Sequence, residues 1–425
     1  MITEFLTKKA LDVTFNGAKN AIARVLKDAK GKFVLRRDGF EQSLKLHLTE
    51  IENWSSQVSF SDLSKAKYLS DIFIELDLFV YPRRIRIHPS ERINSIPLKR
   101  IFDHSDSHII LLGQPGAGKT TSMKRLCQLL LHDRDFYPDR FNFPILVKLR
   151  ELNNLTNTSQ TTLVIDQIYQ ILGLSVELPE QTNEKERESK WKDIKQKVVT
   201  DVLNELRVLL ILDGFDELVN SEDRQEVIRI IKKLSVHLNE ATMIVTSRSG
   251  DFIYTINNAE QFEISPLSED QIGQFASRWL NDDEKATHFI KKVVESPFSD
   301  AAIRPLTLAH LCAIYDRSGE IPEKPKTVYR KIINLLLEEW DAQRTVKRAS
   351  RYAGFEADRK AEFLSRLAYE LTTQFQTTVF STEDLIEIYK SICSDFDLPS
   401  NEARQVAKRT GNTYGATSSN RIRTV

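Results

Sequence analysis

The sequence predicts an α/β fold in which a five-stranded, mostly parallel sheet is flanked by helices and lies between two all-α regions. Two observations lead to this prediction. From residue 104 to residue 264, short apolar runs alternate with helical patterns, which is typical of a parallel sheet with crossover helices. Before and after this stretch helical periodicity dominates, apart from one short β-rich segment near the N-terminus.

The N-terminal region, residues 1–90, is expected to be helical with a short β-rich linker. Apolar spacing predicts helices over residues 2–29 and about 40–54. Residues 68–81 are β-rich and are followed by the basic stretch 83–86. We interpret this stretch as a solvated edge in preference to a phosphate site.

The second region, residues 91–265, contains the predicted sheet. Strands are expected at residues 108–112, 144–149, 208–212, 243–246 and, with the weakest signal, 262–264. The helices between them are expected at residues 119–132, 163–172, 190–206 and 221–238. Because helices follow each of the first three strands, we expect neighbouring strands to run parallel.

The remaining chain is predicted to be helical, with a helical domain at residues 266–345 and a further helical region at 346–425. Ser268 and Gln271 form a capping box that starts the first helix. Further helices are expected at residues 306–315, 327–343, 357–372 and 382–393. The last 25 residues are polar and lack periodicity, so we expect a flexible tail there.

The composition is that of an ordinary globular protein. The 425 residues suggest about three domains. With 41% apolar and 28% charged residues, 14 Gly and 13 Pro, collagen-like, disulfide-scaffold and wholly disordered classes are excluded. The 60 basic residues balance the 60 acidic ones, so nucleic acid is not indicated as a partner. The three cysteines lack metal-binding spacing and are interpreted as buried thiols.

The sequence also predicts a cytoplasmic protein without a membrane partner. Its apolar runs fall far short of the roughly 20 residues that span a bilayer. The first residues carry an early acid and no apolar core of the length found in secretory signals.

A glycine-rich motif follows the first predicted strand of the sheet. Residues 113–120 match the phosphate-binding pattern G-x-x-x-x-G-K-[ST] between a strand and a helix. The glycines allow backbone N–H groups to face phosphate oxygens, Lys119 is expected to reach the β- and γ-phosphates, and Thr120 to bind Mg²⁺. The sequence therefore predicts a P-loop NTPase core, with these candidate nucleotide-binding residues: Gly113, Gln114, Pro115, Gly116, Ala117, Gly118, Lys119, Thr120 and Thr121.

An acidic segment follows the apolar strand at residues 208–212. Asp213 ends this strand and is expected to hold Mg²⁺ or its water, as in a Walker B strand. Asp216 and Glu217 follow closely, and one of them can orient the attacking water as general base. Spacing does not separate their roles. The alternative interpretation is an exposed acidic turn without a catalytic role. The presence of three carboxylates in a chain that also has a P-loop argues against this alternative.

The strand at residues 243–246 leads to Arg248 at its C-terminal end, where open parallel sheets bind ligands. The guanidinium of Arg248 is a candidate to pair with γ-phosphate oxygens. It would stabilise charge in the transition state or report which nucleotide is bound. The alternative is an arginine that caps the sheet edge.

These residues together resemble a known family. The loop 113–121, the block Leu-Ile-Leu-Asp-Gly-Phe-Asp-Glu-Leu at 210–218 and Thr-Ser-Arg at 246–248 are similar to the motifs of NACHT-type NTPases of the STAND class. Residues 265–272, 304–308, 321–322 and 335–340 resemble the helical region after NACHT cores, and 69–76 resembles an element that precedes the loop in bacterial members. The resemblance covers about residues 65–345.

The resemblance implies a nucleotide switch that is closed with ADP and open and self-associating with ATP. ATP or ADP and Mg²⁺ would be its cofactors, with slow ATP hydrolysis, and Pro305 would pack near the adenine. The implied biology is bacterial antiviral (antiphage) defence with an unknown protein or phage-derived trigger. The family usually continues through a winged-helix domain, so residues 346–425 would be an incomplete winged-helix-like region of an apparently shortened chain.

Two other functions remain open from the sequence. One is an AAA+-like remodelling ATPase with continuous turnover, which rapid steady-state hydrolysis would favour. The other is a non-hydrolysing regulatory scaffold that holds nucleotide permanently. A GTPase is disfavoured because the sequence contains no Asn-Lys-x-Asp motif.

Overall fold

A computed structural model of the chain describes residues 8–29, 32–33, 36–58, 67–80, 95–154, 163–174, 176–177, 184–218, 221–296, 302–321, 357–376, 379–404 and 421–423. The basic stretch at 83–86 and the helix expected at 327–343 lie outside these residues.

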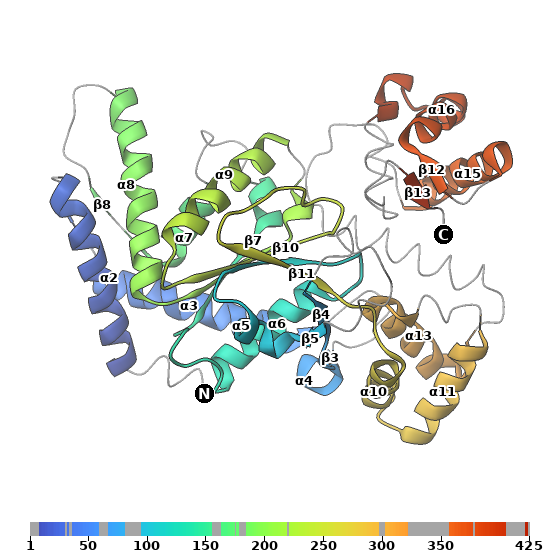
Figure 1. Ribbon diagram of the computed structural model, residues 1–425, viewed down its shortest axis with the longest axis horizontal. Coiled ribbons are helices and arrows are strands. Elements are labelled where there is room, and N and C mark those ends of the chain that lie inside the picture. Colours follow the sequence, from blue (N-terminus) through green and yellow to red (C-terminus); the bar gives the residue numbers. More distant parts are fainter. Residues whose placement is uncertain are drawn as a thin grey trace.

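A seven-stranded sheet occupies the centre of the molecule (Figure 1). Its order is β5-β4-β11-β6-β10-β9-β7. Five adjacent strands run parallel and confirm the predicted fold class; they are β6 (His108–Leu112), β7 (Pro144–Lys148), β9 (Leu209–Asp213), β10 (Thr242–Ser247) and β11 (Ala259–Ile264). Two short antiparallel strands, β4 (Asp77–Phe79) and β5 (Ser95–Pro97), extend the edge beyond the five strands predicted.

Helices cover the sheet close to where the sequence predicted them. They are α6 (Lys119–His132), α7 (Leu163–Ile171), α8 (Glu184–Glu205) and α9 (Ser221–His237). Because helices cover the sheet, every residue of β6, β9 and β10 is buried. This burial explains why these strands are almost continuous apolar runs in the sequence.

The N-terminal helices pack directly onto this core. Helix α2 (Lys8–Ala29) lies against α8, and α3 (Arg37–Ser56) lies against α6. At the sheet edge, the backbone N–H of Leu146 on β7 donates to Nε2 of His47 at 3.2 Å. Burial lowers the pKa of His47 to about 4, so its ring is neutral and can accept this bond near pH 7. The N-terminal helices and the sheet therefore share one hydrophobic core.

The segment expected to be β-rich is only partly extended. It contains β3 (Lys67–Tyr68), which pairs with β2 (Gln57–Val58), then the short helix α4 (Leu69–Ile72) and β4. Residues 69–72 form a helical turn packed on α10, so the β-rich segment is interrupted there. Only residues 77–79 of this segment join the large sheet.

Three helices follow the sheet, namely α10 (Glu269–Leu280), α11 (Asp283–Glu295) and α13 (Pro305–Ser318). The predicted capping box is present, because Ser268 accepts from the backbone of Gln271 while the Gln271 side chain accepts from the backbone of Ser268. Gln271 also donates to the carbonyl of Glu75 at 2.9 Å, which ties α10 to the segment before β4. Helix α11 was not anticipated.

The last described helices, α15 (Ala357–Phe375) and α16 (Thr382–Ile392), share a smaller core of their own. There β12 (Val379–Ser381) pairs with β13 (Arg421–Arg423). Residues 421–423, within the segment expected to be a flexible tail, thus have a partner strand for their backbone groups.

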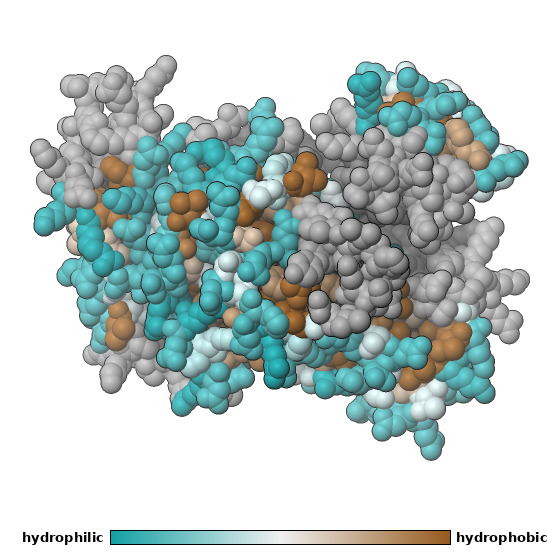
Figure 2. Space-filling model, in the orientation of Figure 1, coloured by the Kyte–Doolittle hydropathy of each residue, from teal (hydrophilic) through white to brown (hydrophobic). Residues whose placement is uncertain are grey.

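Two further expectations concern the surface and the cysteines. The face seen in Figure 2 is largely hydrophilic, with hydrophobic residues in separate patches. No helix in the described part of the chain is both long and apolar enough to cross a membrane. All three cysteines are buried free thiols, as interpreted from the sequence.

Candidate nucleotide-binding site

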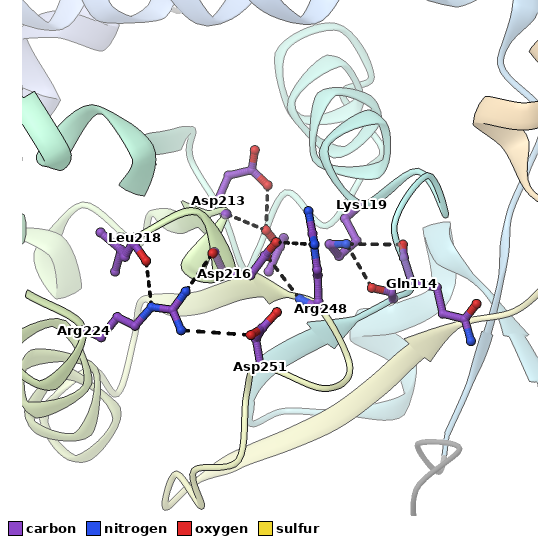
Figure 3. Close-up of polar contacts among 11 residues, drawn as sticks. Gln114, Lys119, Asp213, Asp216, Leu218, Arg224, Arg248 and Asp251 are labelled. Carbon is purple, nitrogen blue, oxygen red and sulfur yellow. Dashed lines mark hydrogen bonds and ion pairs between the residues drawn. The ribbon is translucent and has the colours of Figure 1, made fainter. Parts of the chain in front are cut away.

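Three neighbouring strands bring the predicted motifs to one edge of the sheet (Figure 3). Strand β6 leads into the glycine-rich loop, β9 ends at Asp213 and β10 ends at Ser247. The N–H of Gly113 donates to the carbonyl of Ser247 at 3.2 Å, which joins the loop to β10. The carboxyl ends of parallel strands are the usual place for ligands in such sheets.

The glycine-rich loop surrounds the ammonium group of Lys119. Gln114, Pro115 and Ala117 lie in the turn before α6, while Thr120 and Thr121 lie in its first turn. Lys119 Nζ donates to the carbonyl of Gly113 at 2.9 Å and to that of Gln114 at 3.4 Å. Burial lowers the pKa of Lys119, and the charge of Asp216 partly opposes this shift. The ammonium group therefore lies over the loop that is predicted to bind phosphate.

Asp213 is the centre of a hydrogen-bond network. Thr120 Oγ1 donates to Asp213 Oδ2 at 3.0 Å, and Thr246 Oγ1 donates to Asp213 Oδ1 at 2.6 Å. Thr246 Oγ1 in turn accepts from the N–H of Gly214 at 2.8 Å. Burial raises the pKa of Asp213, while the bonds from Thr246 and Thr120 favour its charged form. The sequence identified Thr120 and Asp213, but not this role for Thr246.

The oxygens of Thr120 and Asp213 fit a magnesium ion. Mg²⁺ takes hard oxygen ligands and is usually held by one or two protein groups together with substrate phosphates. The two side chains meet at the start of α6, beside Lys119. The donor set is therefore suitable for Mg²⁺ that arrives with a nucleotide.

Asp216 and Arg248 form an ion pair beside Lys119. Arg248 Nε lies 2.8 Å from Asp216 Oδ2, and the backbone N–H of Arg248 donates to Asp216 Oδ1 at 3.1 Å. From α9, Arg224 donates to the backbone carbonyls of Asp216 at 2.9 Å and Leu218 at 2.7 Å. Figure 3 shows this arrangement, in which both carboxylate oxygens of Asp216 have an Arg248 partner.

Glu217 ends the short 3-10 helix η4 (Phe215–Glu217) that follows Asp213. Burial, and then the charges of Asp216 and Asp213, raise the pKa of Glu217 to about 7. Gly214 has φ +83°, and a Cβ there would lie 3.0 Å from Cδ of Glu217. The Glu217 side chain therefore folds back over Gly214, a glycine that the sequence analysis did not single out.

The start of α13 lies on the glycine-rich loop. The N–H of Leu306 donates to the carbonyl of Gly116 at 3.2 Å. Gly116 has φ +73°, and a Cβ there would lie 3.0 Å from Cβ of Leu306. A Cβ at Gly118 would lie 3.9 Å from Cγ of Pro305 and 3.3 Å from Cδ1 of Leu76. The structure thus brings Pro305 to the loop, together with two leucines that the sequence analysis did not single out as site residues.

A parallel sheet in which one strand leads into such a glycine-rich loop and another ends in a buried aspartate at the same edge defines a P-loop NTPase. Residues 107–283 match the family model of the NACHT domain. This part of the chain is a NACHT domain, as its motifs indicated, and NACHT domains are nucleotide-binding NTPases.

Two solved structures with distant similarity illustrate the comparison. Cdc6p from Pyrobaculum aerophilum is 14% identical with a TM-score of 0.32, and the match covers 81% of this chain and 92% of that one. A RuvB variant from Thermotoga maritima is 11% identical with a TM-score of 0.27, covering 75% of this chain and 84% of that one. Such similarities carry no argument about function. No curated protein sequence matches the chain.

Proposed function

We propose that this chain is an ATP-binding molecular switch whose bound nucleotide controls the position of its helical region. The observation that carries this proposal is the contact between Leu306 at the start of α13 and Gly116 of the phosphate loop. A ligand shifts a conformational equilibrium only through contacts that differ between the two states. A helix that touches the phosphate loop directly can respond to such differences.

The residues at the sheet edge have distinct proposed roles in hydrolysis. Bound Mg²⁺ would neutralise charge on the β- and γ-phosphate oxygens, held by Thr120 and Asp213 directly or through water. Lys119 would contact the same phosphates. Glu217 would accept the proton of the attacking water, because a base with a pKa near the working pH is effective.

We assign Asp216 a different role, that of anchoring Arg248. Both of its carboxylate oxygens already bind Arg248, which leaves Glu217 as the better base. Held in this way, the guanidinium of Arg248 would be available to γ-phosphate oxygens. Pro305 would pack near the adenine, with Leu306 and Leu76 as apolar neighbours at the loop.

The wider proposal concerns turnover and biology. We propose slow hydrolysis, self-association through the NTPase core in the ATP state, and a cytoplasmic role in bacterial antiviral defence with an unknown protein or phage-derived trigger. The NACHT match supports nucleotide binding, and the similarity of residues 69–76 to an element of bacterial members supports the biological setting.

Nucleotide analysis of the purified protein tests the proposed function. Mass spectrometry of the released nucleotide is expected to find adenine nucleotides, and sizing with Mg²⁺ is expected to give a larger species in ATP than in ADP. Rapid steady-state hydrolysis with one size in both nucleotides would instead indicate a remodelling ATPase.

The rate of ATP hydrolysis is expected to depend on pH through Glu217. A carboxyl with a pKa of about 7 is mostly protonated below that pH and cannot act as a base. The rate should therefore rise about tenfold per pH unit below about pH 7 and level off above it. Phosphate release from pre-bound Mg·ATP measures this profile, and ATP affinity over the same range is the control. A rate that does not change across pH 7 would contradict the assignment.

Replacing Gly214 with alanine is expected to slow hydrolysis by about 100-fold with little change in ATP binding. The new Cβ would occupy the space of the Glu217 side chain, and φ of +83° strains any residue with a Cβ. Gly319→Ala is a matched control, since Gly319 also has a positive φ, of +68°, but nothing within 4 Å of the added Cβ. We expect both variants to be less stable in thermal denaturation and only Gly214→Ala to hydrolyse slowly. Equal rates in the two variants would refute the displacement of Glu217.

A further inference from the structure

We infer that Asn153 is a positioning residue for hydrolysis, because its side chain fixes the backbone of Glu217. Asn153 lies in the 3-10 helix η3 (Leu149–Asn154) that follows β7, and it is 6% exposed. Its Nδ2 donates to the carbonyl of Arg150 and to the carbonyl of Glu217, both at 3.0 Å. The inference rests on the proposed role of Glu217 as the general base.

The sheet topology explains how Asn153 reaches the acidic turn. Strands β7 and β9 are parallel neighbours, and Lys148 at the end of β7 is paired with Asp213 at the end of β9. The turns after these strands, η3 and η4, therefore lie in contact. The amide of Asn153 bridges the two turns, with one bond to its own turn and one to the other.

The acidic turn depends on such bonds. The last carbonyls of a helix have no partner within it, and η4 has only a single turn. Here three successive carbonyls accept hydrogen bonds from side chains of other elements. Arg224 donates to those of Asp216 and Leu218, and Asn153 donates to that of Glu217. Asp216 is held further by its pair with Arg248. Asn153 is thus the side chain that fixes the proposed base from the β7 side.

Removal of the amide should displace Glu217 without removing it. Leucine has the same number of side-chain heavy atoms and the same branching as asparagine but no donor, so the buried carbonyl of Glu217 would lose its partner and the turn would shift toward water. A misplacement of about 1 Å can cost about 100-fold in rate. Thr120, Asp213 and Lys119 form their hydrogen bonds with other groups, so nucleotide binding should persist.

The test compares kinetics and pH profiles of Asn153→Leu with those of the parent chain. We expect kcat to fall about 10- to 100-fold while the Kd of Mg·ATP changes less than about twofold. The rising limb of the pH–rate profile should move to lower pH, because a more exposed Glu217 loses part of the burial that raises its pKa. If Asn153 only stabilised the fold, the rising limb of the profile would stay at the parental pH.

Asn142→Leu is the matched control. Asn142 Nδ2 donates to the carbonyl of Leu206 at 2.8 Å, which joins the opposite ends of the same two strands. Its loss should lower the melting temperature to a similar extent, with the hydrolysis rate and pH profile unchanged. Equal kinetic effects of the two variants, or a parental kcat in Asn153→Leu, would overturn the inference.

A second variant keeps the test decisive if Asn153→Leu does not fold. Asn153→Asp keeps the size and polarity but removes both donors, so its kcat should also fall. Its rising limb should move to higher pH, because a second carboxylate disfavours ionisation of Glu217. An unchanged rate and limb would overturn the inference. Failure of the base assignment itself appears separately, as parental hydrolysis in Glu217→Gln.

Discussion

Replacement of Lys119 with alanine is expected to weaken the binding of both ATP and ADP by at least about 100-fold. Loss of one partner in a buried charge pair typically costs this much or more. The fold should survive, because the hydrogen bonds that Lys119 Nζ makes within the described residues go to the loop carbonyls of Gly113 and Gln114. Burial of the ammonium group is unfavourable, which is why it lowers the pKa of Lys119. The alanine variant does not bear this free-energy cost, so its fold is not weakened by it.

Lys124→Ala on the same helix is the control for this variant. Lys124 Nζ donates to the carbonyl of Gln57 at 2.6 Å and lies 5.3 Å from the ring centroid of Trp54. Its loss should loosen the contact between α6 and α3 and lower the melting temperature, with nucleotide affinity retained. Isothermal titration with ADP and with Mg·ATP measures both variants. An unchanged nucleotide affinity in Lys119→Ala would contradict the assignment of residues 113–120 as a phosphate-binding loop.

The central sheet could be predicted because its strands are buried on both faces. Strand β6 and helix α6 have the predicted bounds, since apolar runs and the glycine loop mark them locally. Strands β4 and β5 have three residues each, too few for a periodic signal. Strand β4 is placed in the sheet by pairing with β11, which is distant in sequence, and β5 by pairing with β4.

The motif residues of the site were also predictable, whereas their partners were not. Lys119 and Asp213 stand next to strand ends, so local sequence reveals them. The bond from Thr246 to Asp213 depends on β10 and β9 being neighbours, which strand order along the chain does not reveal. The contacts of Asn153 with Glu217 and of Leu306 with Gly116 likewise arise from tertiary packing. The domain boundaries at residues 90 and 265 stay a prediction.

Replacement of Glu217 with glutamine is expected to lower kcat by about 10³-fold while Mg·ATP binding persists. Glutamine has the shape of a protonated glutamate, so the variant should behave at every pH as the parent does at low pH. Its residual rate should therefore not rise through pH 7. Single-turnover phosphate release over that range checks this, with Asp216→Asn as the comparison. Because Asp216 is assigned to anchoring Arg248, Asp216→Asn should hydrolyse slowly but keep the rising limb.

Stability provides an independent check on the Glu217 variant. A carboxyl whose pKa is raised on folding, here from 4.5 to about 7, contributes stability below the lower value that is lost as the pH rises through the upper one. Above pH 7 the buried charge beside Asp216 and Asp213 is therefore unfavourable, and glutamine removes it. The nucleotide-free variant should melt at a higher temperature than the parent at pH 8, and at a similar temperature near pH 4. A variant that is inactive yet more stable would exclude unfolding as the cause, whereas a lower melting temperature at pH 8 would contradict the burial of Glu217 on which the assignment depends.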